Sequence, residues 1–111
     1  MSLPDFITAF PGISLPLPEG AVSTSAMRTE QGLAVFFTVH RDVTLPPHSH
    51  GDQWGTVLSG QLALTREGRT QVYAPGESYF IPAGQEHAAS VPAGSVILDV
   101  FAGPDRYPLQ P

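Results

Sequence analysis

Two histidines one residue apart are the side chains with the clearest chemical potential in this 111-residue chain; they lie in the stretch PPHSHGDQWGTVLSG, residues 46–60. In an extended strand, residues i and i+2 point to the same face, about 6.6–7 Å apart along the strand. His48 and His50 therefore project together if the stretch is extended, which Pro46 and Pro47 favour. Two imidazoles on one face can bind one metal ion, whereas the simpler interpretation is a loop with two exposed histidines.

A third histidine follows a strand–turn–strand pattern in GESYFIPAGQEHAAS, residues 76–90. Pro82 is expected to end a strand where no ladder donor is needed, and Gly84 permits a tight bend. His87 would then begin the returning strand. Such an arrangement can bring His87 opposite His48 and His50 across a barrel, so the three histidines together predict a metal centre.

The rest of the chain predicts the elements that would position these histidines. Its 11 glycines and 12 prolines are spread along the sequence and separate short apolar or β-branched stretches, as in proteins with many strands and tight turns. We expect Asp5 to cap one helical turn through Phe10, and no stretch has convincing helical periodicity. An all-β sandwich or small barrel is predicted. About eight strands are expected, at 21–27, 33–40, 53–59, 61–65, 70–74, 78–81, 87–91 and 95–101.

Length and composition limit the function classes. One domain is expected, with an N-terminal extended segment (1–20), a barrel domain (21–104) and a C-terminal tail (105–111). The net charge of −5, with no lysine, argues against nucleic acid as a partner, and the absence of cysteine excludes disulfides and thiolate metal sites. No apolar run approaches the ~20 residues that span a bilayer, and no signal-peptide pattern is present. We therefore expect a cytoplasmic protein with no membrane partner.

The two histidine motifs together resemble those of the cupins, which are small antiparallel jelly-roll barrels. The first cupin motif usually reads G-x5-H-x-H-x(3,4)-E-x6-G, and it is matched here by His48, His50 and Gly60. The second usually reads G-x5-P-x-G-x2-H-x3-N, and it is matched by Gly76, Pro82, Gly84 and His87. The resemblance covers residues 33–102. It implies an all-β fold, a cupin jelly-roll barrel with at most a short N-terminal helical turn.

Departures from the motifs bear on the metal site. Gln53 stands where the family usually has glutamate, and an amide oxygen can also be a ligand. The spacing is one residue shorter than usual, so Asp52 is a rival ligand. Asp42 and Val91 replace the usual glycine and asparagine. The resemblance implies one divalent transition metal ion per chain (Zn, Ni, Fe, Mn or Cu, which the sequence does not distinguish); the alternative is a barrel that holds no metal. The implied ligands are His48, His50, Gln53 and His87.

The strand SVILDVF, residues 95–101, carries an acid among apolar residues, which is costly to bury unless it is paired. Asp99 therefore lies at the site or on a solvated face; its apolar neighbours favour the site, where it could act as a general base. The stretch ILDVFAGPDRYPL resembles cupins that convert unsaturated monouronates into linear keto acids. This implies that Phe101 lines the pocket and Arg106 binds the substrate carboxylate, unless Arg106 is an exposed tail residue. By alternation, Tyr79 rather than Phe80 should face the interior as a pocket wall.

These observations predict a metal-binding cupin, with a small-molecule ligand, that acts as an enzyme on a small organic acid or sugar derivative. The expected reaction is that of an isomerase or lyase or, with iron, an oxygenase. The alternative is a module that binds or senses a small ligand without catalysis. The resemblance also implies a homodimer, formed through an edge strand or an exchanged N-terminal segment, and residues 3–17 suit that exchange. Trp54 should point away from the metal, into the core or a dimer surface.

Overall fold

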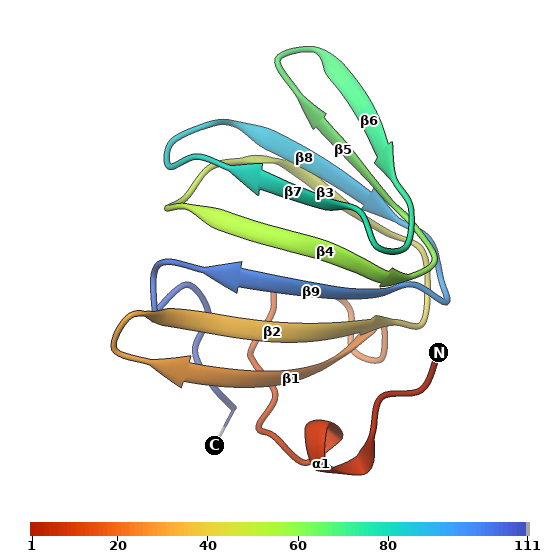
Figure 1. Ribbon diagram of the computed structural model, residues 1–111, viewed down its shortest axis with the longest axis vertical. Helices are drawn as coiled ribbons and strands as arrows, with labels where there is room; N and C mark the ends of the chain where they lie inside the picture. The colour runs from red at the N-terminus through yellow and green to blue at the C-terminus, as the bar shows by residue number, and fades with distance from the viewer. Residues whose placement is uncertain (111) are drawn as a thin grey trace.

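The computed structural model describes residues 1–110 and shows two antiparallel sheets that face each other (Figure 1). One sheet has five strands, in the order β1 (Val22–Thr29), β2 (Gly32–Val39), β9 (Val96–Phe101), β4 (Gln53–Ser59) and β7 (Ser78–Ile81). The other has four, in the order β3 (Val43–His48), β8 (His87–Val91), β5 (Leu62–Arg66) and β6 (Arg69–Tyr73). A short helix, α1 (Asp5–Thr8), precedes them. This architecture confirms the predicted jelly-roll.

Side-chain alternation along the strands fills the space between the sheets. In the five-stranded sheet, Val57 of β4 lies opposite Ile97 of β9, and both are almost completely buried. In the four-stranded sheet, Leu62 and Leu64 of β5 are buried in the same core cluster. Burial of each such side chain contributes roughly 1.5–3 kcal/mol to folding. The core therefore joins the two sheets and holds the ends of their strands in fixed positions.

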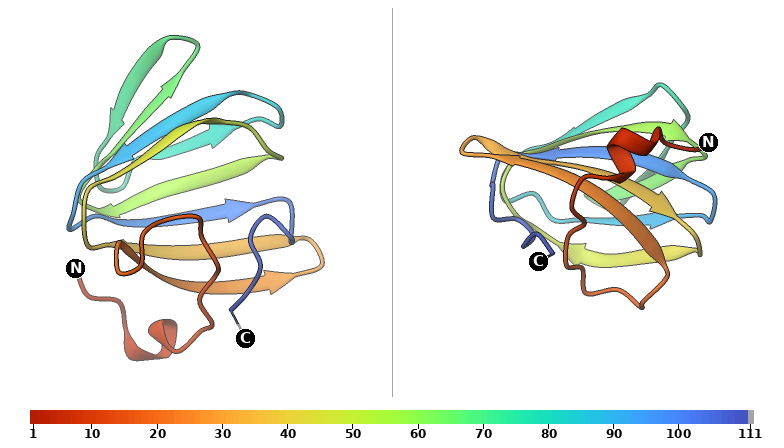
Figure 2. Two further views of the ribbon diagram at one scale, coloured as in Figure 1. Left: turned by 180° about the vertical axis from the view of Figure 1, so that it is seen from behind. Right: turned by 90° about the horizontal axis from the view of Figure 1, so that it is seen from below.

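The N-terminal segment closes one side of the barrel and lies against its own chain (Figure 2). The amide of Ala26 donates a hydrogen bond to the carbonyl oxygen of Pro11 (2.8 Å). The amide of Ile13 donates one to Oγ1 of Thr24 (2.9 Å). Ile13 also forms a β-bridge with Leu109 in the C-terminal tail. The N-terminal segment and the described part of the C-terminal tail are thus attached to the barrel. No helix within residues 1–110 is long and apolar enough to cross a membrane.

Two local features differ from the sequence predictions. The structure contains the eight predicted strands and adds a ninth, β3, which includes Pro46 and Pro47. β3 tolerates prolines because it is an edge strand whose pairing with β8 is irregular between Leu45 and His48, so the missing amide donors leave no gap in a central ladder. At α1, Pro4 rather than Asp5 occupies the N-cap position, no side chain caps the helix, and the helix ends at Thr8.

Candidate metal centre

The three histidines of the two motifs meet inside one end of the barrel. His48 is the last residue of β3 and pairs directly with His87, the first residue of β8. His50 lies in the loop beyond β3. The ring centroids are 5.4 Å apart for His48 and His50, 4.3 Å for His48 and His87, and 4.9 Å for His50 and His87. One ring nitrogen from each residue lies within 4.8 Å of the other two, which is close enough to share an ion.

Hydrogen bonds between two loops hold His50 near its partners, although it lies outside the strand. The amide of Gly84, in the turn before β8, donates to the carbonyl oxygen of His50 (2.9 Å). In the same turn, the amide of Ala83 donates to Oδ1 of Asp52 (2.7 Å). The loop that carries His50 is therefore fastened to the turn that precedes His87. The sequence suggested that His50 would lie beside His48 on one face of a strand. In the structure, this contact between the loop and the turn positions His50 instead.

The main chain orients all three imidazoles in the same way. Nδ1 lies 2.8 Å from the carbonyl oxygen of Pro46 in His48, 2.8 Å from that of Gly51 in His50, and 2.9 Å from that of Gln85 in His87. A carbonyl oxygen only accepts hydrogen bonds, so each Nδ1 is the donor, and in the neutral ring Nε2 is the nitrogen with the free lone pair. Nε2 of His50 is buried and has no hydrogen-bond partner. Such orientation by a hydrogen bond at the second nitrogen is typical of metal-binding histidines.

The electrostatic surroundings favour the neutral form of two of these rings. Burial lowers the pKa of His50 and of His87 below the ordinary value of 6.5, although the hydrogen bond of each ring to a backbone carbonyl acts in the opposite direction. Arg106 and His48 lower both pKa values further; His87 also lowers the pKa of His50, and Arg66 also lowers that of His87. Neutral imidazole is the form that binds a metal, because a protonated nitrogen has no lone pair to donate.

Gln53, not Asp52, lies on the same cavity as the three histidines. Gln53 begins β4 and is buried, whereas Asp52 is exposed and its carboxylate is occupied by the amide of Ala83. The structure therefore separates the two rival ligands: only the amide side chain faces the interior. Trp54, the next residue, is 43% exposed and points to the outer face of the sheet, away from the histidines, as expected.

Asp99 is buried beside the histidines, on the site side of its strand. Oη of Tyr79 donates a 2.6 Å hydrogen bond to Oδ1 of Asp99. Burial raises the pKa of Asp99 from 3.8 to about 6, while hydrogen bonds from the side chains of Tyr79 and Gln53 lower it in part. Burial and the neighbouring Asp99 raise the pKa of Tyr79 well above its usual value, so the phenol stays protonated and acts as a donor.

Phe101 and Arg106 take different positions relative to the cavity. Phe101 lines it and packs edge-on against the ring of His50, with centroids 5.7 Å apart. The guanidinium of Arg106 lies over the ring of Tyr107, 4.2 Å from its centroid, and is 5.8 Å from that of Phe101. Arg106 is half-buried, but it is not among the residues that line the cavity. Its positive charge nevertheless acts on His50 and His87.

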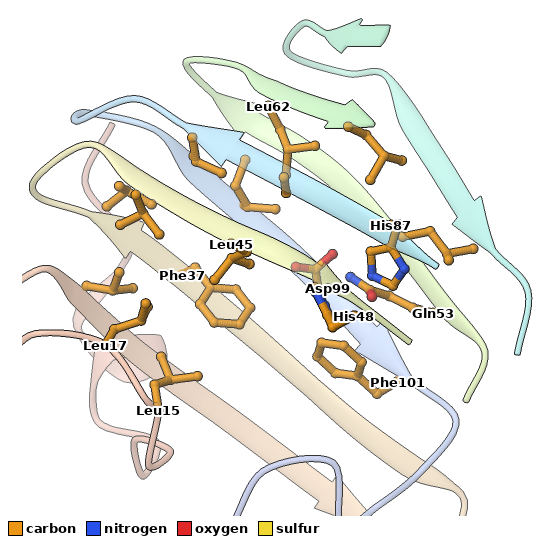
Figure 3. A pocket seen from close by; sticks show the side chains of 18 of the residues that line it. Leu15, Leu17, Phe37, Leu45, His48, Gln53, Leu62, His87, Asp99 and Phe101 are labelled. Atoms are coloured by element: carbon orange, nitrogen blue, oxygen red, sulfur yellow. The ribbon is translucent and has the colours of Figure 1, made fainter. Parts of the chain in front are cut away.

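One cavity of about 110 Å³ extends from the histidines into the barrel (Figure 3). Space for a single water molecule needs roughly 10–15 Å³, so this cavity has room for part of a small organic molecule. His48, Gln53, His87 and Asp99 gather at one end of the view, and Leu15, Leu17, Phe37, Leu45 and Leu62 lie along the rest.

Sequence reasoning missed two contributors to this site. Gly55 lies opposite both Tyr79 and Asp99 in the strand register, and a methyl group there would collide with the side chains of both. Its signal is an isolated glycine inside a strand, which often marks a close approach. The other contributor is the N-terminal segment, whose Leu15 and Leu17 line the cavity. The sequence shows that this segment contains apolar residues, but no local pattern predicts that they line the cavity.

Comparison with known proteins agrees with this geometry. A family model described as a cupin domain matches residues 35–101, which is more than half of the chain. No curated protein matches the chain. Among solved structures, KdgF from Halomonas sp. is 26% identical with a TM-score of 0.70, over 84% of this chain and 87% of that one.

Two further solved structures share the fold at lower identity. An RmlC-like cupin from Shewanella frigidimarina is 23% identical with a TM-score of 0.70, over 85% of this chain and 86% of that one. A cupin superfamily protein from Desulfitobacterium hafniense is 17% identical with a TM-score of 0.68, over 79% and 83% of the two chains. At these identities the likeness supports the barrel architecture alone.

Proposed function

Because the chain belongs to the cupin family, we propose that it is a metal-dependent enzyme that moves a proton on a small organic acid. The reaction class is that of an isomerase or lyase. The single observation that carries the proposal is that a buried carboxyl group, Asp99, lines the same cavity as three converging histidines. Burying an acid is costly and ligand binding alone gives no reason for it, whereas a buried carboxyl group beside a metal-held substrate can transfer a proton.

The residues present fit a single divalent transition metal ion. His48, His50 and His87 would supply three Nε2 atoms, and the amide oxygen of Gln53 would supply the fourth ligand. None of these ligands carries a negative charge. An ion held there would keep its full charge and act as a Lewis acid on a substrate carboxylate or carbonyl.

Asp99 would exchange the proton with the bound substrate. Tyr79 donates to Oδ1 and fixes the rotation of the carboxyl group, so the group that moves the proton is already oriented before substrate binds. In the metal-free protein, burial raises the pKa of Asp99 to about 6, so its carboxyl group holds a proton more readily near neutral pH than an ordinary aspartate does. Phe101 would form the wall of the pocket beside His50.

The test compares a ligand variant with a proton-transfer variant. His48→Ala should lose the metal, measured by inductively coupled plasma mass spectrometry of untagged protein, and with it all turnover. Asp99→Asn should retain the metal yet lose turnover by at least hundredfold. His40→Ala is the matched control, because His40 lies outside the cluster and bonds to Ser23. Unchanged turnover in Asp99→Asn would contradict the proposed role of Asp99, whereas metal-loaded wild type that binds small acids without turning them over would favour the binding module.

Unsaturated monouronates belong in the first substrate screen. The stretch around Asp99, Phe101 and Arg106 resembles cupins that act on them, and KdgF from Halomonas sp. is among the similar structures. Arg106 would bind such a carboxylate only if its guanidinium left the ring of Tyr107. Short keto and hydroxy acids form the second part of the screen.

We also propose a homodimer formed through the outer face of the five-stranded sheet. One row of outward-facing residues crosses all five strands in register, and we call it the sheet-face row: Met27, Ala34, Val100, Trp54 and Phe80. Four of its members are large apolar side chains exposed by 38–52%. The neighbouring outward row adds Phe36 and Leu98, and neither row contains a charged residue. Such a face is typical of protein interfaces.

The row is self-complementary, which supports a second copy of this chain as its partner. A two-fold axis along β9 through Val100 places Trp54 opposite Ala34 of the partner subunit, a large side chain against a small one. The same axis places Phe80 opposite Met27 of the partner subunit. Since each chain has a net charge of −5, an uncharged contact face is the one on which two copies meet with the least repulsion.

A further inference from the structure

The cavity beside the histidines is polar at one end only. Its polar groups are linked to the histidines: Gln53 and Asp99 lie beside them, Tyr79 bonds to Asp99, and Tyr107 packs on Phe101. Within residues 1–110, its lining includes no serine, threonine, asparagine, lysine or arginine. Its other walls are aliphatic or aromatic, including Leu15, Leu17, Phe37, Leu45, Leu62 and Ile97 (Figure 3).

We infer that the substrate is an acid with a branched or linear apolar tail, rather than a polyhydroxylated sugar acid. The polar head would lie at the histidines, and the tail would occupy the apolar part of the cavity. Each buried hydroxyl of a sugar would lack a partner there, which weakens binding by roughly tenfold or more. This inference rests on the proposed function only for the position of the head.

The N-terminal segment supplies part of the apolar wall of the cavity. Leu15 and Leu17 are half-buried and belong to a segment held by the bridge between Ile13 and Leu109. Their side chains lie on the same side of the cavity as Phe37 (Figure 3). These residues therefore determine selectivity for the tail, while the histidines bind the head.

Calorimetric binding to zinc-loaded protein tests the inference with three probes. Pyruvate has the acid head without a tail, 4-methyl-2-oxopentanoate has the same head with a branched tail, and galacturonate has a carboxylate with hydroxyls. A buried methylene strengthens binding by roughly fourfold, so the branched keto acid should bind at least tenfold more tightly than pyruvate. Equal affinities, or tighter binding of galacturonate, would overturn the inference.

Variants of the N-terminal wall locate the tail. Leu17→Asn should weaken binding of 4-methyl-2-oxopentanoate about fivefold and leave pyruvate unchanged, whereas Val72→Asn, at an exposed position outside the cavity lining, should affect neither. Leu15→Asn serves as a second variant should Leu17→Asn disturb folding. A loss shared equally by both keto acids would contradict the placement of the tail.

Metal-free protein separates this inference from the proposed function. Neutral 4-methylpentan-2-one has the same tail without a carboxylate, and it should shift the methyl NMR signals of Leu17 and Leu45. If it does so in protein that cannot be loaded with any metal, the metal proposal fails and the apolar site stands. If metal loads and pyruvate binds but the tail adds no affinity and shifts no methyl signal, the apolar site fails and the metal proposal stands.

Discussion

Tyr79 and Asp99 come from different strands and bond to each other across a third. Tyr79 lies in β7, Asp99 lies in β9, and Gly55 of β4 is the register partner of both. The 2.6 Å hydrogen bond passes over the glycine because no side chain occupies the space between them. The acid of the site is thus oriented by a phenol two strands away, through a gap that only glycine provides.

Replacing Asp99 by asparagine should change how stability depends on pH. Burial raises the pKa of Asp99 from 3.8 to about 6, so the native state binds this proton more tightly than the unfolded chain does. The carboxyl group therefore stabilises the fold most below pH 3.8, and this contribution is lost as pH rises through 6. Above pH 6, ionising the buried group costs about 3 kcal/mol.

The measurement is urea unfolding of metal-free wild type and Asp99→Asn from pH 4 to 8. The free energy of unfolding of the variant, relative to wild type, should rise by roughly 2–3 kcal/mol over this range. Contributions from His50 and His87, whose lowered pKa values favour stability at higher pH, are common to both proteins and cancel. A pH-independent difference would show that Asp99 titrates normally.

Removing the phenol should raise the pKa of Asp99. The hydrogen bond from Tyr79 favours the carboxylate, so Tyr79→Phe leaves it with less stabilisation and its pKa moves above 6. The carboxyl ¹³C signal of Asp99, followed by NMR during a pH titration of metal-free protein, reports this directly. A stability loss of about 1 kcal/mol is expected as well. A titration curve that does not move would mean that Tyr79 has no influence on the acid.

A methyl group at position 55 should disrupt the pair. In Gly55→Ala the added carbon meets Oδ1 of Asp99 and the phenol of Tyr79, so both side chains must shift within a packed core. We expect a loss of roughly 1–3 kcal/mol in unfolding free energy and reduced turnover, with the metal content retained. Gly103→Ala is the matched control, because nothing lies within 4 Å of its added carbon. Equal stabilities of the two variants would contradict the close approach.

A charge in the sheet-face row should separate the proposed dimer. Phe80→Glu places a carboxylate in an uncharged face, and sedimentation velocity should show dissociation at concentrations where wild type is dimeric. Val72→Glu is a matched control, since Val72 is 54% exposed and Phe80 is 52% exposed, but Val72 lies on the other sheet. Wild type that sediments as a monomer at all concentrations would exclude the interface.

The strands and one pocket residue could be predicted from sequence because they depend on local patterns. Alternating apolar residues and regularly spaced turns predicted the eight strands, and alternation within SYFI placed Tyr79 inside and Phe80 outside. β3 was not among the predicted strands because Pro46 and Pro47, although they favour extended backbone, lack the amide donors of a strand ladder. Only the position of β3 at a sheet edge, a tertiary property, makes those prolines acceptable.

The remaining parts of the site depend on contacts between distant segments. Asp52 and Gln53 are adjacent, and a shift of one residue moves a side chain to the other face of a strand. The motif spacing is one residue shorter than usual, so it did not decide which of the two faces the site. The role of Gly55 requires the register of three strands. Arg106 stacks on Tyr107, its neighbour in the chain, and this contact keeps it off the cavity lining. None of these relationships is encoded in a short stretch of sequence.

The carbonyl groups that orient the three histidines have a consequence for how this protein can evolve. Every residue has a carbonyl, so a substitution at Pro46, Gly51 or Gln85 removes a side chain and still leaves the acceptor in place. The centre is thus insulated from most mutations around it, and its neighbours are free to diverge. Laboratory evolution can therefore remodel the cavity toward new substrates while the imidazole cluster is inherited intact.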